Sequence, residues 1–351
     1  MQEKYTSIGL MSGTSLDGLD LAYCTFWLTN GKWNYELIHG ETIHYSSDWK
    51  NRLQNAPSLS PDKLTTLDLE YGQYLGEQTA DFIKNLKLKP DFIASHGHTV
   101  FHKPEEGYTL QIGNGAVLRT HISSPLIYDF RTQDVQLGGQ GAPLVPIGDQ
   151  LLFSQFDACI NIGGFANIST TKKNNRIAWD ICPANIMMNP IAEMLGNAYD
   201  KNGDWARSGT INPPLLKALN ELDFYKKAAP KSLGKEWVEE YINPIIQQYG
   251  ATKKDTLRTL IEHISMQISY DLQNIKGDVL FSGGGVFNTF LMETIQSKIE
   301  NSIVNPSQKI IDFKEALIFA FMGLLRYRQE VNVLASVTGA SKDHSSGNII
   351  Y

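Results

Sequence analysis

The sequence predicts an α/β protein of two lobes, each opening with a three-stranded antiparallel sheet. Its 351 residues exceed the usual size of one domain, so that each half is long enough to bury a core. The three-stranded pattern occurs at the start of the chain and again near its middle, which indicates an internal duplication. We expect an N-terminal lobe of residues 1–140 and a C-terminal lobe of residues 141–351, with a last helix that could pack back onto the first lobe.

The first half of the chain has the pattern of strands around one long helix. Asn30 and Gly31 form a typical hairpin turn between the second and third strands. Apolar residues recur at helical spacing from Pro61 to Leu86, which predicts an amphipathic helix. The predicted strands are residues 5–11, 20–28, 32–45 and 91–95.

The second half begins in the same way and is richer in helices. Two strands start at Phe156 and Phe165, and a third follows the turn at Asn174 and Asn175 and ends at Asp180. A short strand covers residues 278–282. The predicted helices are residues 183–195, 237–248, 253–275, 287–299 and 313–328.

Composition excludes several classes of protein. A net charge of -6 argues against nucleic acid as the main partner. The apolar run of residues 316–325 is too short to span a bilayer, and the N-terminus lacks the apolar core of a signal peptide. Cys24, Cys159 and Cys182 are odd in number and widely spaced, as expected of reduced thiols. We therefore expect a cytoplasmic protein without a membrane partner.

Four glycine-rich segments are the main signal of chemistry. One alone would be an ordinary turn, but several placed after strands favour a nucleotide bound by backbone N–H groups. None has the spacing of a P-loop or of a dinucleotide-binding fold. The remaining common architecture has two ribonuclease H-like lobes of the actin and hexokinase type with an interlobe cleft. The segments are SGTSLDG (12–18), GGQGAP (138–143), NIGGFAN (161–167) and SGGGVFN (282–288).

The stretch GLMSGTSLDGLD, residues 9–20, resembles the signature of the anhydro-N-acetylmuramic acid kinases, a branch of that ATPase superfamily. Further blocks in family order include SHGHTVFHKP, DFRTQD, NIGGFANIS, WDICPAN and NVLASVTGAS. The resemblance implies that the enzyme opens the 1,6-anhydro ring of a muramic acid sugar with water. It also implies transfer of a phosphoryl group from ATP to O6, which gives N-acetylmuramic acid 6-phosphate in cell-wall recycling. Relatives are homodimers, so the resemblance implies a dimer.

The resemblance assigns the catalytic base to Asp180. Such a carboxylate takes a proton from the water that attacks the anomeric carbon. The residues themselves leave another interpretation open, because an Asp that precedes Pro183 could cap the next helix. The family motif has Thr and two Gly where this chain has Ile181, Cys182 and Ala184, so that bulk beside the base could narrow the pocket.

The resemblance also assigns residues to ATP and its Mg²⁺. Asp17 could hold the metal directly or through water, or it could only stabilise its turn. Relatives in the superfamily usually carry an acidic residue in the first strand, where this chain has Leu10 and Met11. The ATP residues are Gly13, Thr14, Ser15, Leu16, Asp17, Gly18, Leu19 and Asp20 in the first loop, Gly163, Gly164 and Asn167 in the second, and Gly283, Gly284 and Gly285 near the adenosine.

For the sugar, the resemblance implies contacts from His96, Thr99, Arg131 and Glu315. Arg131 suits a bidentate bond to the lactyl carboxylate. Arg131 could instead be a surface ion-pair partner, and Glu315 could only favour a helix N-terminus. His98 stands where the family has Gln.

Two other functions stay open at this point. A protein of the same fold could bind sugar or nucleotide and have lost catalysis, for which the altered surroundings of Asp180 are the support. A metal hydrolase could use His96, His98 and His102, because three imidazoles within seven residues could share a zinc ion.

Overall fold

The computed structural model describes residues 3–13, 15–249 and 252–351, which form two compact units. The first unit joins the chain up to Leu152 with Phe313–Tyr351, and the second is Phe153–Asp312. From the sequence we expect the division near residue 140. Residues 146–152 and 313–327 pack with the first unit, because Gly148 contacts Ile318 and Gly9 contacts the backbone of Ala316.

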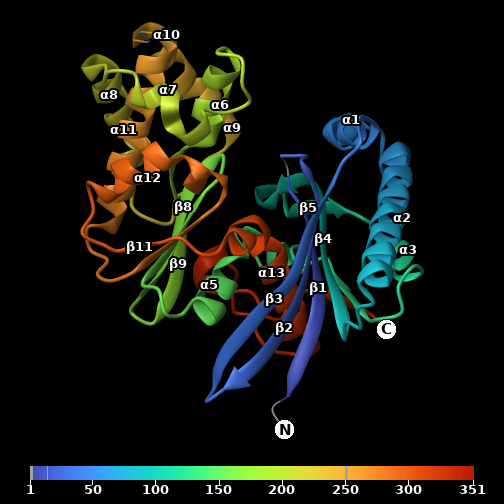
Figure 1. Ribbon diagram of the computed structural model, residues 1–351. Coiled ribbons are helices and arrows are strands. Elements are labelled where there is room, and N and C mark those ends of the chain that lie inside the picture. Colours follow the sequence, from blue (N-terminus) through green and yellow to red (C-terminus); the bar gives the residue numbers. More distant parts are fainter. Residues whose placement is uncertain (1–2, 14, 250–251) are drawn as a thin grey trace. The chain divides into compact units, whose positions relative to one another are not determined.

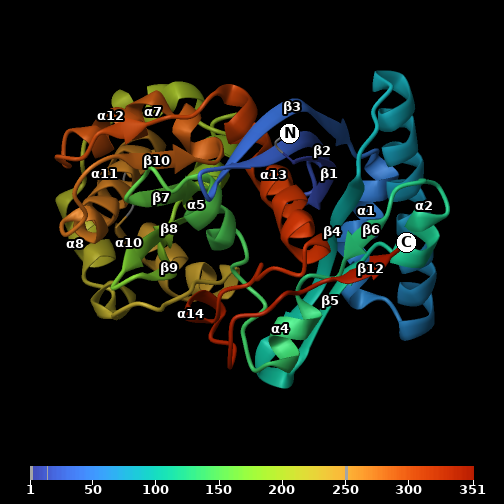
Figure 2. The same cartoon turned by 90° about the horizontal axis from the view of Figure 1, so that it is seen from below.

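The first unit is built on a seven-stranded sheet with the order β12-β6-β4-β1-β2-β3, in which β5 also pairs with β4 (Figures 1 and 2). β1, β2 and β3 form an antiparallel meander, whereas β4 pairs parallel to β1 and β6 pairs parallel to β4. The strands are β1 (Lys4–Ser12), β2 (Gly18–Thr29), β3 (Lys32–His44), β4 (Phe92–Lys103), β5 (Tyr108–Ile112), β6 (Leu126–Tyr128) and β12 (Asn348–Ile350).

Helices cover both faces of this sheet, with α2 on one face and α13 on the other (Figures 1 and 2). Alternation along β1 explains the arrangement, since successive side chains point to opposite faces. Ile8 and Leu10 join the core beneath α2, while a Cβ at Gly9 would lie 1.9 Å from the carbonyl oxygen of Ala316 in α13. The helices are α1 (Ser47–Asn55), α2 (Pro61–Leu86), α3 (Gly115–Arg119), α4 (Thr132–Gln136), α5 (Pro146–Leu152), α13 (Gln308–Tyr327) and α14 (Ala335–Thr338).

The second unit repeats the same strand topology. Its five-stranded sheet has the order β11-β10-β7-β8-β9, with an antiparallel meander β7-β8-β9 and parallel pairs β7-β10 and β10-β11. Both sheets thus have the strand order of the ribonuclease H fold, and the two-lobed fold class is confirmed. The strands are β7 (Ala158–Ile162), β8 (Phe165–Lys172), β9 (Asn175–Pro183), β10 (Val279–Ser282) and β11 (Ile303–Val304). The cleft expected between the lobes stays a prediction.

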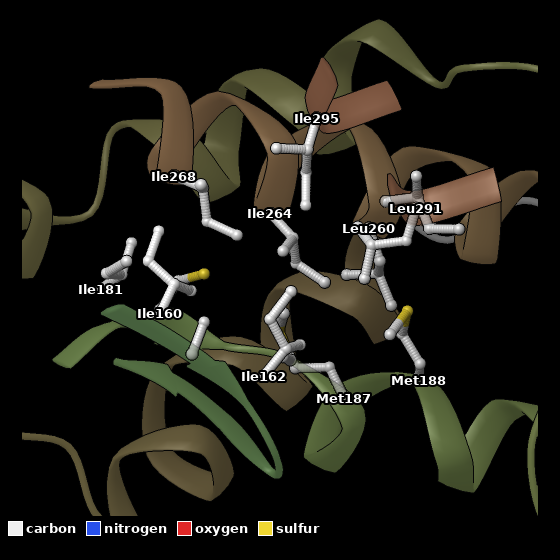
Figure 3. Packing of buried hydrophobic residues seen from close by; sticks show 14 of the residues in the cluster. Ile160, Ile162, Ile181, Met187, Met188, Leu260, Ile264, Ile268, Leu291 and Ile295 are labelled. Carbon is white, nitrogen blue, oxygen red and sulfur yellow. The ribbon is translucent and has the colours of Figure 1, made fainter. Parts of the chain in front are cut away.

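The core of the second unit lies between one face of this sheet and the helices packed on it, which include α6, α11 and α12 (Figure 3). Ile160 and Ile162 of β7 meet Ile264 and Ile268 of α11, together with Leu291 of α12. The helices are α6 (Asn185–Glu193), α7 (Asp204–Arg207), α8 (Pro213–Asn220), α9 (Lys235–Trp237), α10 (Asn243–Tyr249), α11 (Lys253–Leu272) and α12 (Thr289–Gln296).

Several details differ from the sequence prediction. The helix expected at 237–248 is three segments, in which the π-helical turn Val238–Ile242 joins α9 to α10. β5, β6 and β12 were not predicted, because they are short and pair with strands distant in sequence. All three cysteines are buried. In the described part of the chain, no helix is both long and apolar enough to cross a membrane.

Candidate functional site

The first glycine-rich turn joins β1 to β2 in the first unit. The carbonyl of Asp17 accepts from the backbone N–H of Tyr45, which ties the turn to the end of β3, and Asp17 itself is exposed. Asp20 already lies in β2 and accepts from the Thr42 hydroxyl at 2.6 Å. The Leu19 side chain is buried in the core, so only its backbone faces the turn. Thr14 lies outside the described residues.

A buried chain of hydroxyl groups supports this turn. Tyr45 donates to Oγ of Ser12 at 2.7 Å, and the hydroxyls of Tyr45 and Tyr71 are 2.6 Å apart. Since Tyr45 has one proton and gives it to Ser12, Tyr71 donates to Tyr45. The Ser12 hydroxyl forms a further hydrogen bond with Nδ1 of His98 at 2.9 Å. Burial lowers the pKa of His98 to about 4, so that its ring stays neutral.

Gly97 separates the histidines of β4. Its φ of +74° is left-handed, and a Cβ there would lie 2.6 Å from the carbonyl oxygen of Ile112. As a result, the His96 ring packs against Phe319 of α13, while the His98 ring packs against Tyr71 of α2 on the other face. His96 and His98 therefore do not converge, and no three metal-binding side chains cluster among the described residues.

Arg131 lies beside His96 in the first unit and is half-buried. Its Nε–H donates to Nε2 of His96 at 2.9 Å, and Nη1 donates to the carbonyl of Gly141 at 2.6 Å. Both partners are neutral, and within residues 3–13, 15–249 and 252–351 Arg131 forms no ion pair. Burial lowers the pKa of Arg131 to about 10, and the charges of Glu315 and Asp134 oppose that shift.

Glu315 lies two residues after a kink at Phe313, where two helical segments of α13 meet, and so it is near the start of the second, apolar segment. Its side chain reaches solvent, yet surrounding protein atoms desolvate the carboxylate and raise its pKa, which the charges of Arg131 and Lys314 oppose. Lys314 forms a buried ion pair with Asp149 of α5 at 2.8 Å. Thr99, on β4, accepts from the Gln111 amide at 3.4 Å.

The segment GGQGAP has a structural role that its sequence did not reveal. The sequence predicted that this segment follows a strand, but it follows the helix α4. Asp134 of α4 anchors it. The buried carboxylate of Asp134 accepts from the Gly141 N–H at 2.6 Å and from the Thr338 hydroxyl at 2.7 Å. This anchor places the Gly141 carbonyl that holds Arg131.

In the second unit, two glycine-rich turns lie side by side. β7 and β10 are adjacent parallel strands, and Gly163 and Gly164 follow β7 as Gly283 follows β10. A Cβ at Gly283 would lie 2.7 Å from the Ile162 carbonyl oxygen. The N–H groups of Gly164 and Gly284 have no hydrogen-bond partner among the described residues.

A row of polar side chains crosses the sheet next to these turns. Asn161, Asn167 and Asp180 are direct partners across β7, β8 and β9. Partners in antiparallel strands share a face, and here the core residues Ile160, Ile162 and Ile168 take the opposite face. The row therefore lies on the face of the sheet away from the core of the second unit.

The segment after Pro230 holds Asp180 from the edge of β9. The Asp180 N–H donates to the Lys231 carbonyl at 2.9 Å, and the Leu233 N–H donates to Oδ2 of Asp180 at 2.8 Å. Desolvation raises the pKa of Asp180, and the bond from Leu233 opposes the shift. Asp180 caps no helix, because β9 continues to Pro183 and the N-cap of α6 is Ala184.

The residues that depart from the family motif are buried in the core. Ile181, Cys182 and Ala184 are each at most 1% exposed and belong to the core of the second unit. The Ala184 N–H donates to the Gly164 carbonyl at 2.7 Å, which links α6 to the glycine turn. Their side chains therefore contribute to the core of the second unit.

Sequence reasoning missed the residues that orient the site. Ser12, Tyr45, Asp134 and Leu233 act through contacts with segments distant in the chain. A buried aspartate in DFRTQD and a serine directly before the first glycine were the available signals.

Comparison with known proteins identifies the family. The family model for anhydro-N-acetylmuramic acid kinase matches residues 5–351. A protein of that name from Legionella pneumophila (strain Paris) is 33% identical over 357 residues, covering 95% of this chain and 94% of the relative. Another of that name from Vibrio cholerae is 32% identical over 376 residues and covers 100% of both chains. The chain therefore belongs to the anhydro-N-acetylmuramic acid kinase family.

Proposed function

We propose that the protein is an ATP-dependent kinase of 1,6-anhydro-N-acetylmuramic acid that produces N-acetylmuramic acid 6-phosphate. Membership of the family supports the substrate and the reaction. The observation that carries the proposal is the row Asn161, Asn167 and Asp180, which ends in a partly desolvated carboxylate on the sheet that carries the two glycine turns.

In the proposed reaction, Asp180 takes one proton from a water molecule as the water oxygen attacks C1 of the sugar. The C1–O6 bond breaks, and O6 attacks the γ-phosphorus of ATP, which releases ADP. Desolvation makes the carboxylate a stronger base than an exposed aspartate, because its charged form is less stabilised. The Leu233 N–H holds Oδ2 and leaves Oδ1 for the water.

For ATP, the N–H groups of Gly164 and Gly284 suit phosphate oxygens, since they are donors without a protein acceptor. The first turn, Gly13–Asp20, is proposed to bind phosphate as well. The exposed Asp17 carboxylate fits Mg²⁺, which typically takes one or two carboxylates and the substrate phosphates. When bound, that ion would neutralise charge on the phosphates.

For the sugar, Arg131 is proposed to bind the lactyl carboxylate, because its two hydrogen-bond partners in the described part of the chain are neutral and do not balance its positive charge. Glu315 and Thr99 are proposed to accept or donate hydrogen bonds to sugar hydroxyls. A cytoplasmic location and a homodimer, which the sequence analysis expects, remain part of the proposal.

Turnover tests the proposal. Purified protein, ATP, Mg²⁺ and the anhydro sugar should give ADP and a 6-phosphorylated sugar, detected by ³¹P NMR and mass spectrometry. Asp180→Asn should lower kcat by about 10²- to 10⁴-fold, the usual contribution of a general base. Asp271→Asn is the matched control, because Asp271 is another desolvated carboxylate of the same unit, bonded to Trp179.

The outcomes separate the proposal from its alternative. Equal turnover by wild type and Asp180→Asn would remove Asp180 as the base. Binding of sugar or nucleotide by the wild type without turnover would favour the binding protein that has lost catalysis.

A further inference from the structure

The His96 ring is fixed in one protonation state by its two contacts. An arginine Nε–H can only donate, so Nε2 of His96, 2.9 Å away, accepts with its lone pair. The ring proton therefore sits on Nδ1, which is 2.9 Å from the Gly97 carbonyl oxygen, a group that can only accept. The two contacts require the same tautomer. The ring is 4% exposed and packs on Phe319 of α13.

Within the described part of the chain, part of the Arg131 guanidinium donates hydrogen bonds to the protein, and its other N–H groups do not. Of the five N–H donors of an arginine, His96 takes Nε–H and the Gly141 carbonyl takes one on Nη1. Both N–H groups of Nη2 and one of Nη1 have no hydrogen-bond partner among the described residues. That set of donors matches the two oxygens of a carboxylate.

The geometry points to His96 as a positioning residue, which orients the guanidinium of Arg131 for the carboxylate of the sugar and does not itself touch the substrate. The inference rests on the proposed function. A protonated His96 would offer a second donor to Arg131 and repel it, so the arrangement requires a neutral ring. Burial and the charge of Arg131 both keep it neutral, since they lower the pKa of His96 well below its usual value.

The first experiment observes the tautomer directly. The protein is labelled with ¹⁵N-histidine, and the His96 signals are assigned by their loss in His96→Gln. We expect a protonated Nδ1 and an unprotonated Nε2 at pH 7.5. The opposite tautomer, or a charged ring, would overturn the inference, and this result does not depend on the substrate.

The second experiment measures recognition of the carboxylate. The dissociation constants of the anhydro sugar and of its neutral lactyl amide are determined by calorimetry, and their ratio is compared among variants. His96→Leu should lower the preference for the acid by about tenfold or more, the size of one hydrogen bond to a charged group. His96→Gln, whose side-chain oxygen can accept from Arg131, should restore most of it.

His102→Leu is the control, because His102 lies on the same strand but bonds to Thr109 and not to Arg131. A wild-type preference in folded His96→Leu, with folding checked by thermal unfolding, would contradict the positioning role. So would an equal loss of affinity for acid and amide, because that indicates only a structural role.

Arg131→Met distinguishes this failure from failure of the proposed function. If Arg131→Met keeps the preference for the acid, or if the wild type has none, the proposed carboxylate contact is wrong. If Arg131→Met loses the preference while His96→Leu keeps it, only the inference about His96 fails.

Discussion

The backbone N–H of Leu233 donates to Oδ2 of Asp180 across 2.8 Å, from a segment 53 residues further along the chain. This bond favours the charged carboxylate, while desolvation favours the neutral acid and is the larger effect, so the pKa of Asp180 is raised. The ionised side chain is therefore held in one orientation at some cost to the stability of the fold.

We expect Asp180→Asn to raise the melting temperature at pH 7. The folded-state pKa lies above the unfolded value, so ionisation opposes folding at neutral pH, and this penalty fades as the pH falls through the raised pKa. An asparagine carries no charge and can still accept from Leu233. Thermal unfolding of both proteins from pH 8 to pH 4.5 measures the difference, which should shrink toward acid pH.

Asp255→Asn should behave in the opposite way and serves as the control. Hydrogen bonds from Thr210 and Thr252 lower the pKa of Asp255, so its ionisation supports folding at neutral pH. A lower melting temperature for Asp180→Asn at pH 7 would contradict the account of its desolvation.

Gly283→Ala and Gly284→Ala separate packing from nucleotide contact. Gly283 has a φ of +84°, and its Cβ would meet Oδ1 of Asn161 at 2.6 Å, whereas a Cβ at Gly284 would meet nothing within 4 Å. We expect Gly283→Ala to lose about 1 to 3 kcal/mol of unfolding free energy and Gly284→Ala to be nearly neutral. Denaturant unfolding measures both.

The same pair tests the nucleotide site. If ATP contacts this turn, Gly284→Ala should raise KM for ATP without a change in stability, and leave KM for the sugar unchanged. An unaltered KM for ATP would argue against Gly284 as a phosphate or adenosine contact.

His263 should make the second unit sensitive to acid. It is fully buried in α11, between Asn220 at 2.6 Å and the Tyr225 hydroxyl at 2.9 Å, and desolvation lowers its pKa to about 3. As the pH falls below about 6.5, the unfolded chain takes up a proton that the folded chain refuses, so stability is lost toward acid pH.

The expected loss from this residue is about 3 kcal/mol between pH 6.5 and pH 4, at 1.36 kcal/mol per unit of pH. Urea unfolding at a series of pH values measures the slope. His263→Gln should flatten it whatever its effect at pH 7, and an unchanged slope would show that other groups carry the acid sensitivity.

Tyr45→Phe should weaken the support of the first turn. It removes the donor to Ser12 and leaves the buried Tyr71 hydroxyl without its acceptor, at a cost of about 1 to 3 kcal/mol. Tyr74→Phe is the control, because the Tyr74 ring packs against Tyr45 without a hydrogen bond from its hydroxyl among the described residues. Thermal unfolding compares the two, and equal melting temperatures would contradict the hydroxyl chain.

Sequence patterns predicted the elements whose signal is local. The helix Pro61–Leu86 was bounded correctly, because Pro61 starts it and its apolar stripe is regular. The two meanders followed from strand patterns separated by short turns. β6 and β12 were missed because three-residue strands show no usable alternation, and only their pairing defines them.

The candidate site likewise has some features that the sequence predicted and others that it did not. Glycine turns after strands are visible in sequence, and the parallel pairing of β7 with β10 brings two of them together. The anchors of Arg131 and Asp180 were not visible, since they come from the His96 ring, the Gly141 carbonyl and the Leu233 N–H. Nearly every residue type has the same backbone N–H and carbonyl groups, so no sequence motif predicts which of them will make such a contact.

The left-handed conformation of Gly97 in β4 has a consequence for which substitutions this protein can accept. His96 and His98, which only Gly97 separates in the sequence, lie in different surroundings: His96 bonds to Arg131, and His98 bonds to Ser12, which also bonds to Tyr45. A substitution of His98 can therefore change the hydrogen bonds of the hydroxyl chain without changing the hydrogen bond between His96 and Arg131. Because of Gly97, positions 96 and 98 of the same strand can change independently of each other.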